Sequence, residues 1–222
     1  MQVLAGPGGP VQWGKPLRHF APDKNERCLE IPLALLAVYR SPLILDGGCA
    51  LNMKDAHDFL PSKIVHVNIS GETAYQHPRR QYVSGDLRAL PFGDKSFPAV
   101  TCLSTLEHIG CDNRHYKGDL ETDPASRWQA VEELRRVASD VVVFSMPYGL
   151  SEMHPSGRWH PFGMEDLSRM LTLLQPATTT VAYYLREPSG WRTAGPIIGQ
   201  QRAWRDQKMV TGLAVVMARV GP

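Results

Sequence analysis

Length, composition and charge restrict the chain to the globular class. It has 222 residues, of which 43% are hydrophobic and 21% are charged, so it can bury one core and is too apolar to be disordered. The formal net charge of +2 argues against nucleic acid or an anionic membrane as partner. No apolar run reaches the roughly twenty residues of a spanning helix, and residues 1–10 lack the features of a signal peptide.

Cysteine usage indicates a reducing compartment. The four cysteines show no CxxC spacing, which argues against both a zinc site and a disulfide framework. They are Cys28, Cys49, Cys102 and Cys111. We therefore expect buried thiols in a cytoplasmic protein.

The chain begins with a segment that shows no regular period. Residues 1–26 are rich in Pro and Gly, so we expect a single domain with an N-terminal arm at 1–26 and a core at 27–222. The aromatic and basic side chains of the arm could pack on the surface of the core or close over a ligand. They are Trp13, Arg18, His19 and Phe20.

Helical and strand patterns alternate after the arm. Apolar residues at three- and four-residue steps predict helices over residues 26–39, 52–60, 128–138 and 164–174. Short apolar or β-branched runs predict strands over residues 43–45, 63–68, 81–84, 99–103, 141–146, 178–185 and 211–220. This alternation predicts an α/β fold, with a mostly parallel sheet and helices on both of its faces.

Four consecutive strands of this sheet end in glycine or polar residues. The ends lie about twenty positions apart, which is the length of one strand-helix unit. In an open α/β sheet, ligands bind at the carboxyl ends of the strands, near the point where the strand order reverses, so all four ends should line one rim. The ends are Asp46 to Gly48, Asn68, Asp86, and Ser104 to His108.

The residue types along this rim suit a nucleoside. Backbone amides at Gly48 can hold a ligand closely, because glycine has no Cβ. A side chain at the position of Asn68 can reach a ribose diol, and Ile69 offers an apolar face to a base. Asp86 can accept a hydrogen bond from an adenine amino group, while Leu87 supplies a backbone N–H.

Two stretches of the rim resemble a known family. Residues 82–100 and the string Ser104-Thr105-Leu106-Glu107-His108-Ile109 are similar to the third- and fourth-strand regions of the class I S-adenosylmethionine-dependent methyltransferases, of the methyltransferase type 11 kind. The resemblance covers residues 26–174. It implies a Rossmann-like seven-stranded sheet with a reversed last strand, and S-adenosylmethionine as cofactor. The implied cofactor-binding residues are Asp46, Gly48, Asn68, Ile69, Asp86, Leu87 and Ser104.

A narrower resemblance points to small methyltransferases encoded among bacterial glycan and polysaccharide genes. It rests on the motifs Glu26-Arg27-x-x-Glu30-x-Pro32, Glu107-His108-Ile109-Gly110 and Met146-Pro147-Tyr148-Gly149. In this comparison, Arg27 and Glu30 could reach the amino-acid end of the cofactor from the first helix.

Several positions depart from the family's pattern. Ala50 and Asn52 stand where glycine is usual, so they could crowd the ligand, or Asn52 could cap the next helix. Asn68 replaces the acid at the ribose, Pro98 replaces another acid, and residues 139–140 replace a Gly-Gly turn. These departures leave open an alternative, a non-catalytic methyltransferase-like binding protein with a degenerate cofactor site.

Methyl transfer to a hydroxyl requires a base for the hydroxyl proton. We predict that His108 is this base and that Glu107 orients it or contacts the substrate. The simpler interpretation is that His108 caps a helix and Glu107 shapes the cofactor pocket. The expected acceptor is a small molecule or a sugar or glycan hydroxyl, whereas an RNA methyltransferase would require a basic stripe, and a nicotinamide dehydrogenase would require GxGxxG in the first turn.

A metal could also acidify a hydroxyl, so the remaining potential ligands matter. They are Asp112, His115, His154 and His160. They lie in predicted loops without tight ligand spacing, and we therefore predict no metal site.

The last distinctive segment is an insert at residues 186–210, between the final two strands. It carries the side chains Trp191, Arg192, Arg202, Trp204 and Arg205. Indole rings stack on sugars and guanidinium groups bind carboxylates, so the insert could wall an acceptor pocket for an anionic sugar. The alternative is a solvated basic hairpin. The oligomeric state and the identity of the acceptor stay open.

Overall fold

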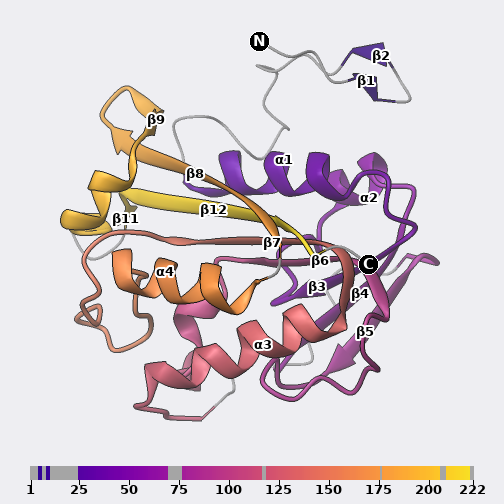
Figure 1. Cartoon of the computed structure of the whole chain (residues 1–222), viewed down its shortest axis with the longest axis horizontal. Coiled ribbons are helices and arrows are strands. Elements are labelled where there is room, and N and C mark those ends of the chain that lie inside the picture. Colours follow the sequence, from indigo (N-terminus) through magenta and orange to yellow (C-terminus); the bar gives the residue numbers. More distant parts are fainter. Residues whose placement is uncertain are drawn as a thin grey trace.

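The computed structural model describes residues 5–6, 9–10, 25–69, 77–116, 119–175, 177–205 and 209–220. The aromatic and basic side chains predicted for the arm, at positions 13 and 18–20, lie outside the described residues. Within the arm, the two short strands β1 (Ala5–Gly6) and β2 (Gly9–Pro10) pair with each other. The predicted core forms one twisted sheet with helices on both faces (Figure 1).

Within the described residues, the sheet has eight strands in the order β5-β4-β3-β6-β7-β12-β8-β9. Their bounds are β3 Leu43–Gly47, β4 Lys63–Asn68, β5 Arg80–Ser84, β6 Phe97–Leu103, β7 Ala138–Pro147, β8 Thr178–Glu187, β9 Gly190–Ala194 and β12 Gly212–Arg219. β12 lies antiparallel between β7 and β8, which is the predicted reversal of the last strand. The predicted number of seven strands is too small, because the insert folds back on β8 and adds β9 as an antiparallel edge strand.

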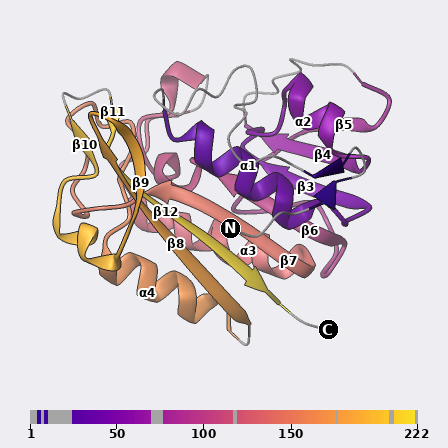
Figure 2. The ribbon, with the colours of Figure 1, turned by 90° about the horizontal axis from the view of Figure 1, so that it is seen from above.

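In the described part of the chain, α-helices cover both faces of the sheet (Figure 2). α1 (Arg27–Val38) and α2 (Lys54–Phe59) pack on one face, and α3 (Arg127–Val137) and α4 (Met164–Leu173) pack on the other. The central strands are therefore buried on both sides, which explains why they are continuous apolar runs without polar alternation. Among the described residues, no helix combines the length and the apolar character that crossing a membrane requires.

Two cysteines correct the expectation of buried thiols. Cys102 and Cys111 are buried, but Cys28 and Cys49 are only partly buried. Cys28 lies in the first turn of α1, at the margin of the core on that face, and Cys49 lies in the turn after β3.

The strand order reverses at β3. The chain runs from β3 outward to β4 and β5, and then returns to place β6 on the opposite side of β3. The connections that leave β3 and β6 therefore diverge, and a crevice opens at the carboxyl ends of these two strands. The predicted rim lies at this crevice.

Candidate functional site

A cavity of about 570 Å³ lies at the carboxyl ends of β3, β4, β5 and β6. Eight of the nine residues predicted for the site line it. They are Gly48, Asn68, Ile69, Asp86, Leu87, Ser104, Glu107 and His108. The sequence argument that consecutive strand ends meet at one rim is therefore correct in geometry.

Asp46 is the one predicted residue that does not line the cavity. Its carboxylate is fully buried under the turn that follows β3. It accepts hydrogen bonds from the backbone N–H of Leu51 (2.8 Å) and from the Thr101 hydroxyl (3.0 Å), and it contacts His66 Nδ1 at 2.9 Å. These contacts occupy both of its oxygens, so Asp46 holds the turn in place from below.

The turn requires glycine at position 48. Gly48 has φ +87°, and a Cβ at this position would come within 2.1 Å of Thr105 Oγ1. Its N–H donates to the Val67 carbonyl at 2.8 Å. We expected the Gly48 amide to contact a ligand. Its hydrogen bond instead joins the turn after β3 to β4 within the protein. Cys49 also adopts a left-handed conformation (φ 61°) and lines the cavity together with Ala50.

Asn52, one of the departures from the family's pattern, has a specific partner. The Tyr82 hydroxyl on β5 donates to Asn52 Oδ1 at 2.8 Å. The N-cap residue of α2 is Met53, so Asn52 does not cap that helix. The hydrogen bond holds the Asn52 side chain at the wall of the cavity that it lines, beside β5.

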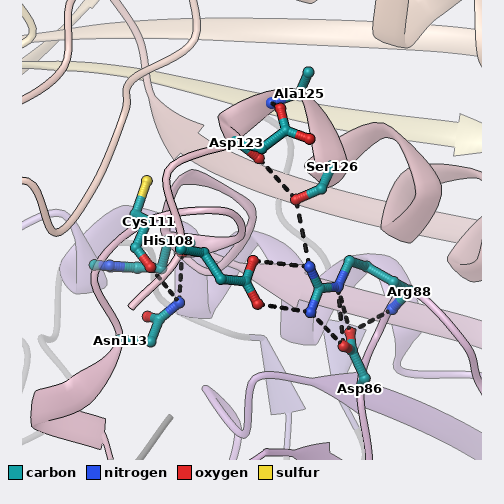
Figure 3. A network of polar contacts seen from close by, with 9 residues as sticks. Asp86, Arg88, His108, Cys111, Asn113, Asp123, Ala125 and Ser126 are labelled. Carbon is teal, nitrogen blue, oxygen red and sulfur yellow. Dashed lines mark hydrogen bonds and ion pairs between the residues drawn. The ribbon is translucent and has the colours of Figure 1, made fainter. Parts of the chain in front are cut away.

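The second and third strand ends present an apolar and an acidic group. Ile69 follows β4 and has 47% of its surface exposed, although it is a large apolar residue. Asp86 follows β5, and its carboxylate receives hydrogen bonds from the Arg88 guanidinium and from the Arg88 backbone N–H (Figure 3). Burial alone would raise the pKa of Asp86, but the Arg88 hydrogen bonds outweigh it and the pKa lies below its ordinary value.

Arg88 links two walls of the cavity, a role that sequence reasoning missed. Its Nη1 and Nη2 donate to the two carboxylate oxygens of Glu121 at 2.8 and 2.9 Å, while its Nη2 also donates to Asp86 at 2.6 Å. Both Arg88 and Glu121 line the cavity. The hydrogen bonds to Asp86 and Glu121 raise the pKa of the Arg88 guanidinium above its ordinary value, so the guanidinium stays charged. This fork, the Arg88 guanidinium with its hydrogen bonds to Asp86 and Glu121, connects the loop after β5 to the segment that precedes α3.

The fourth strand end is supported by a carboxylate from α1. Ser104, which follows β6 with φ 41°, donates its hydroxyl to Glu30 Oε2 at 2.7 Å. Ser145 donates to the same oxygen at 2.5 Å, and Arg27 donates to Glu30 Oε1 at 2.7 Å. Glu30 is fully buried and does not line the cavity, whereas Arg27 does. Of the two side chains expected to reach the amino-acid end of the cofactor, only Arg27 lines the cavity, and its contact with the cofactor stays a prediction.

His108 ends the short 3₁₀ helix η1 (Leu106–His108) that follows β6. Its Nδ1 lies 2.8 Å from the carbonyl oxygen of Arg158, so Nδ1 carries the proton and Nε2 carries the lone pair. Burial lowers the pKa of His108 to about 4. Asn113 Nδ2 donates to the backbone carbonyl of His108 at 2.8 Å and so fixes the main chain (Figure 3).

Glu107 lies beside His108 and is buried. Its Oε1 is 3.9 Å from His108 Nε2, which is too long for a hydrogen bond, so Glu107 does not orient the imidazole as one expectation had it. The Arg158 carbonyl performs that task. Burial raises the pKa of Glu107 to about 8, and within the described part of the chain its Oε2 has no hydrogen-bond partner. Glu107 is therefore largely protonated at neutral pH.

The insert contributes less to the cavity than expected. Of its described residues, Val210 in β11 (Met209–Val210) lines the cavity, and the tryptophans and arginines of the insert do not. Arg192 pairs with Glu187, and Arg202 lies 3.5 Å from Glu152, at exposed positions. The basic side chains are thus solvated, and the anionic acceptor inferred from them loses its support.

The candidate metal ligands are dispersed. Asp112 forms an ion pair with Arg114, and His154 stacks on Trp159. Across the described ranges of the chain, no three His, Cys, Asp or Glu side chains gather in a way that could hold a metal ion.

Comparison with known proteins agrees with this geometry. Residues 45–141, which contain the four strand ends, match the family model described as methyltransferase domain. This stretch of the chain is therefore similar to a methyltransferase domain. No curated protein matches the sequence.

Solved structures show the same fold at low sequence identity. The chain is similar to an S-adenosylmethionine-dependent methyltransferase from Mesorhizobium loti (15% identity, TM-score 0.56, covering 90% of this chain and 100% of that one). A Burkholderia thailandensis 1,6-didemethyltoxoflavin-N1-methyltransferase, solved with that compound and S-adenosylhomocysteine, has 14% identity and a TM-score of 0.53, covering 92% and 80%. The N-methyltransferase NodS from Bradyrhizobium japonicum, in complex with S-adenosylhomocysteine, has 13% identity and a TM-score of 0.52, covering 89% of each chain.

These likenesses confirm the predicted Rossmann-like fold, and the family model supports the resemblance to methyltransferases over residues 45–141. The match to bacterial glycan and polysaccharide methyltransferases stays a prediction.

Proposed function

We propose that this methyltransferase uses S-adenosylmethionine to methylate a hydroxyl of a small molecule, sugar or glycan, with His108 as the base. The proposal rests on one observation above all. His108 lines the cavity with its Nδ1 proton committed to the Arg158 carbonyl, which makes Nε2 the acceptor. A neutral imidazole with a fixed tautomer is the form that a general base requires.

The cavity suits the cofactor in size and in its polar groups. Its volume of about 570 Å³ lies within the usual range for pockets that bind ligands of this kind. Asp86 provides carboxylate oxygens and Ile69 provides an exposed apolar surface, as expected for an adenosine. Arg27 brings a guanidinium to the cavity from α1, which is suited to a carboxylate. When bound, S-adenosylmethionine would supply a methyl group on a sulfonium, and two of the structural relatives are described with the demethylated product bound.

The residues of the chain then supply alignment and proton transfer. The Arg158 carbonyl holds the imidazole ring of His108, and Nε2 accepts the hydroxyl proton as the oxygen becomes nucleophilic. Glu107, protonated at neutral pH, adds no negative charge beside the base until the pH rises toward about 8.

The alternative is a binding protein of the same fold that does not catalyse methyl transfer. The observation in its favour is that Asn52 and Ala50 occupy the wall of the cavity where the family usually has glycine. An RNA acceptor is less favoured, because the formal net charge is only +2.

Calorimetric titration with S-adenosylmethionine and S-adenosylhomocysteine tests the proposal. We expect binding to the wild type, and its loss in Asp86→Ala, with the fold intact by circular dichroism. Asp140→Ala is the matched control, because Asp140 is an exposed acid that is paired with Arg219 away from the cavity. Absence of binding to the wild type would favour the non-catalytic binding protein. If the cofactor binds, loss of methyl transfer in His108→Gln without loss of binding supports the base.

A further inference from the structure

We propose that the acceptor is an uncharged ring compound whose ring stacks on Trp159 while its hydroxyl faces His108. The inference deepens the proposed function and rests on it. It assigns an acceptor-binding role to the segment 158–160, which the sequence analysis did not identify as part of the site.

Trp159 is placed beside the proposed base by two hydrogen bonds. The backbone N–H of His160 donates to the carbonyl of Glu107 at 2.8 Å, and the carbonyl of Arg158 accepts from His108 Nδ1 at 2.8 Å. Trp159 lies between these two contacts in the chain and lines the cavity. Its side chain therefore belongs to the same wall as Glu107 and His108.

A second aromatic side chain flanks the base. Tyr116, in the 3₁₀ helix η2 (Arg114–Tyr116), lines the cavity, and its ring lies edge-on to the His108 imidazole with 5.8 Å between centroids. Tyr116 is 44% exposed. The surroundings of His108 thus present aromatic surface, which favours a flat or cyclic acceptor.

The indole of Trp159 is held rigidly from behind. His154 stacks on it with 4.6 Å between ring centroids and 18° between planes, and Trp204 packs edge-on at 5.3 Å. Both His154 and Trp204 are buried, while Trp159 is only half-buried. Because His154 covers one face of the indole, the opposite face is the one left for a ring in the cavity. Trp204 belongs to the insert and supports the acceptor site without itself lining the cavity.

The charges around the cavity select against an anionic acceptor. Its two arginines are already engaged: Arg27 pairs with Glu30 and is assigned above to a carboxylate of the cofactor, and Arg88 pairs with both Asp86 and Glu121. The acidic side chains that line the cavity are more numerous than these two cations. They are Glu26, Asp86 and Glu121, while Glu107 adds no charge as long as it is protonated. An anionic acceptor would therefore meet net negative charge and no unpaired guanidinium among the described lining residues.

Phenols and neutral sugars share the required chemistry. Each offers an apolar ring face and a hydroxyl on its edge, and indole rings stack on both. Their carboxylated analogues retain the ring and add one negative charge, so paired probes separate the contribution of the ring from that of the charge.

The test measures binding of four probes to the protein saturated with S-adenosylhomocysteine, by ligand-observed NMR. The probes are catechol and methyl glucoside, with protocatechuate and methyl glucuronide as their anionic counterparts. We expect at least one uncharged probe to bind, and to bind more tightly than its anionic counterpart. Whether catechol or methyl glucoside binds identifies a phenol or a sugar.

Variants locate the bound ring. Trp159→Ala should weaken binding of that probe about tenfold, and Trp159→Phe should weaken it less. The matched control is Trp191→Phe, which alters a half-buried tryptophan of β9 that does not line the cavity and should leave binding unchanged. Tighter binding of the anionic probes, no binding of either uncharged probe, or equal binding to Trp159→Ala would overturn the inference. Calorimetry with S-adenosylhomocysteine on the same samples reports on the proposed cofactor site separately, because Trp159 lies on the acceptor side.

Discussion

Glu107 makes the stability of the protein depend on pH in an unusual direction. The side chain is 3% exposed and burial raises its pKa from 4.5 to about 8. An acid with a raised pKa stays protonated in the folded chain under conditions where it ionises in the unfolded chain. The unfolded chain is therefore favoured progressively as the pH rises from about 4.5 to about 8.

The structure gives the size of this effect. Each unit of pKa corresponds to about 1.4 kcal/mol, so the full change amounts to roughly 5 kcal/mol of unfolding free energy. Most of it falls between pH 5 and pH 8. Glu107→Gln removes the ionisation and keeps the shape of the side chain, so the variant should gain stability relative to the wild type as the pH rises across this range.

Urea denaturation of the wild type and Glu107→Gln at a series of pH values measures the difference directly. Glu132→Gln is the matched control, since Glu132 is an exposed acid on α3, and its curve should run parallel to that of the wild type. A difference between wild type and Glu107→Gln that stays constant from pH 5 to pH 8 would refute the reasoning. It would show that Glu107 is ionised in the folded protein, with a partner or solvent contact that the described residues do not provide.

Three further predictions concern the turn, the base and the fork. Gly48→Ala should cost about 2 kcal/mol or more of stability by thermal denaturation and abolish binding of S-adenosylhomocysteine, because φ is +87° and the new Cβ would overlap Thr105. The rate of methyl transfer, measured as a function of pH, should decrease as the pH falls through about 4, where His108 gains a proton. If the rate is half-maximal near pH 6.5 instead, His108 does not act as a buried base. Arg88→Met should lower stability by about 1–2 kcal/mol, because Asp86 and Glu121 lose their common partner, and the loss should be smaller at high salt. An unchanged stability would mean that solvent replaces the guanidinium.

The rim of the site was predictable because it follows from the topology. Parallel strands joined by units of similar length bring their carboxyl ends to one edge, so Asn68, Asp86 and Ser104 had to converge once the strands were placed correctly. Gly48 was predictable for a local reason, since only glycine tolerates both the positive φ and the contact with Thr105. The role of Asp46 was not, because a side chain at the end of a strand can point to either face.

The connections across the cavity were beyond the reach of the sequence. Arg88 and Glu121 are 33 positions apart, and Trp159 lies in a loop whereas Trp204 lies in the short strand β10 (Trp204–Arg205). No period or spacing joins such pairs, since loops follow the packing of the elements that they connect. The composition of the insert was misleading for the same reason. Its tryptophans and arginines suggested a pocket wall, but the fold places Trp204 behind Trp159.

The departures from the family's pattern are best understood together with their partners. Asn52 would be a misplaced side chain in the first turn if it projected alone, but the Tyr82 hydroxyl holds it at 2.8 Å, and Tyr82 itself stacks on His66. His66 in turn contacts the buried carboxylate of Asp46 that supports the turn. The chain thus connects Asn52 through β5 and β4 to the base of the turn. A site that had lost its constraints would have no reason to keep this continuous set of contacts beside a cavity of about 570 Å³, and for that reason we favour a functional site over a degenerate one.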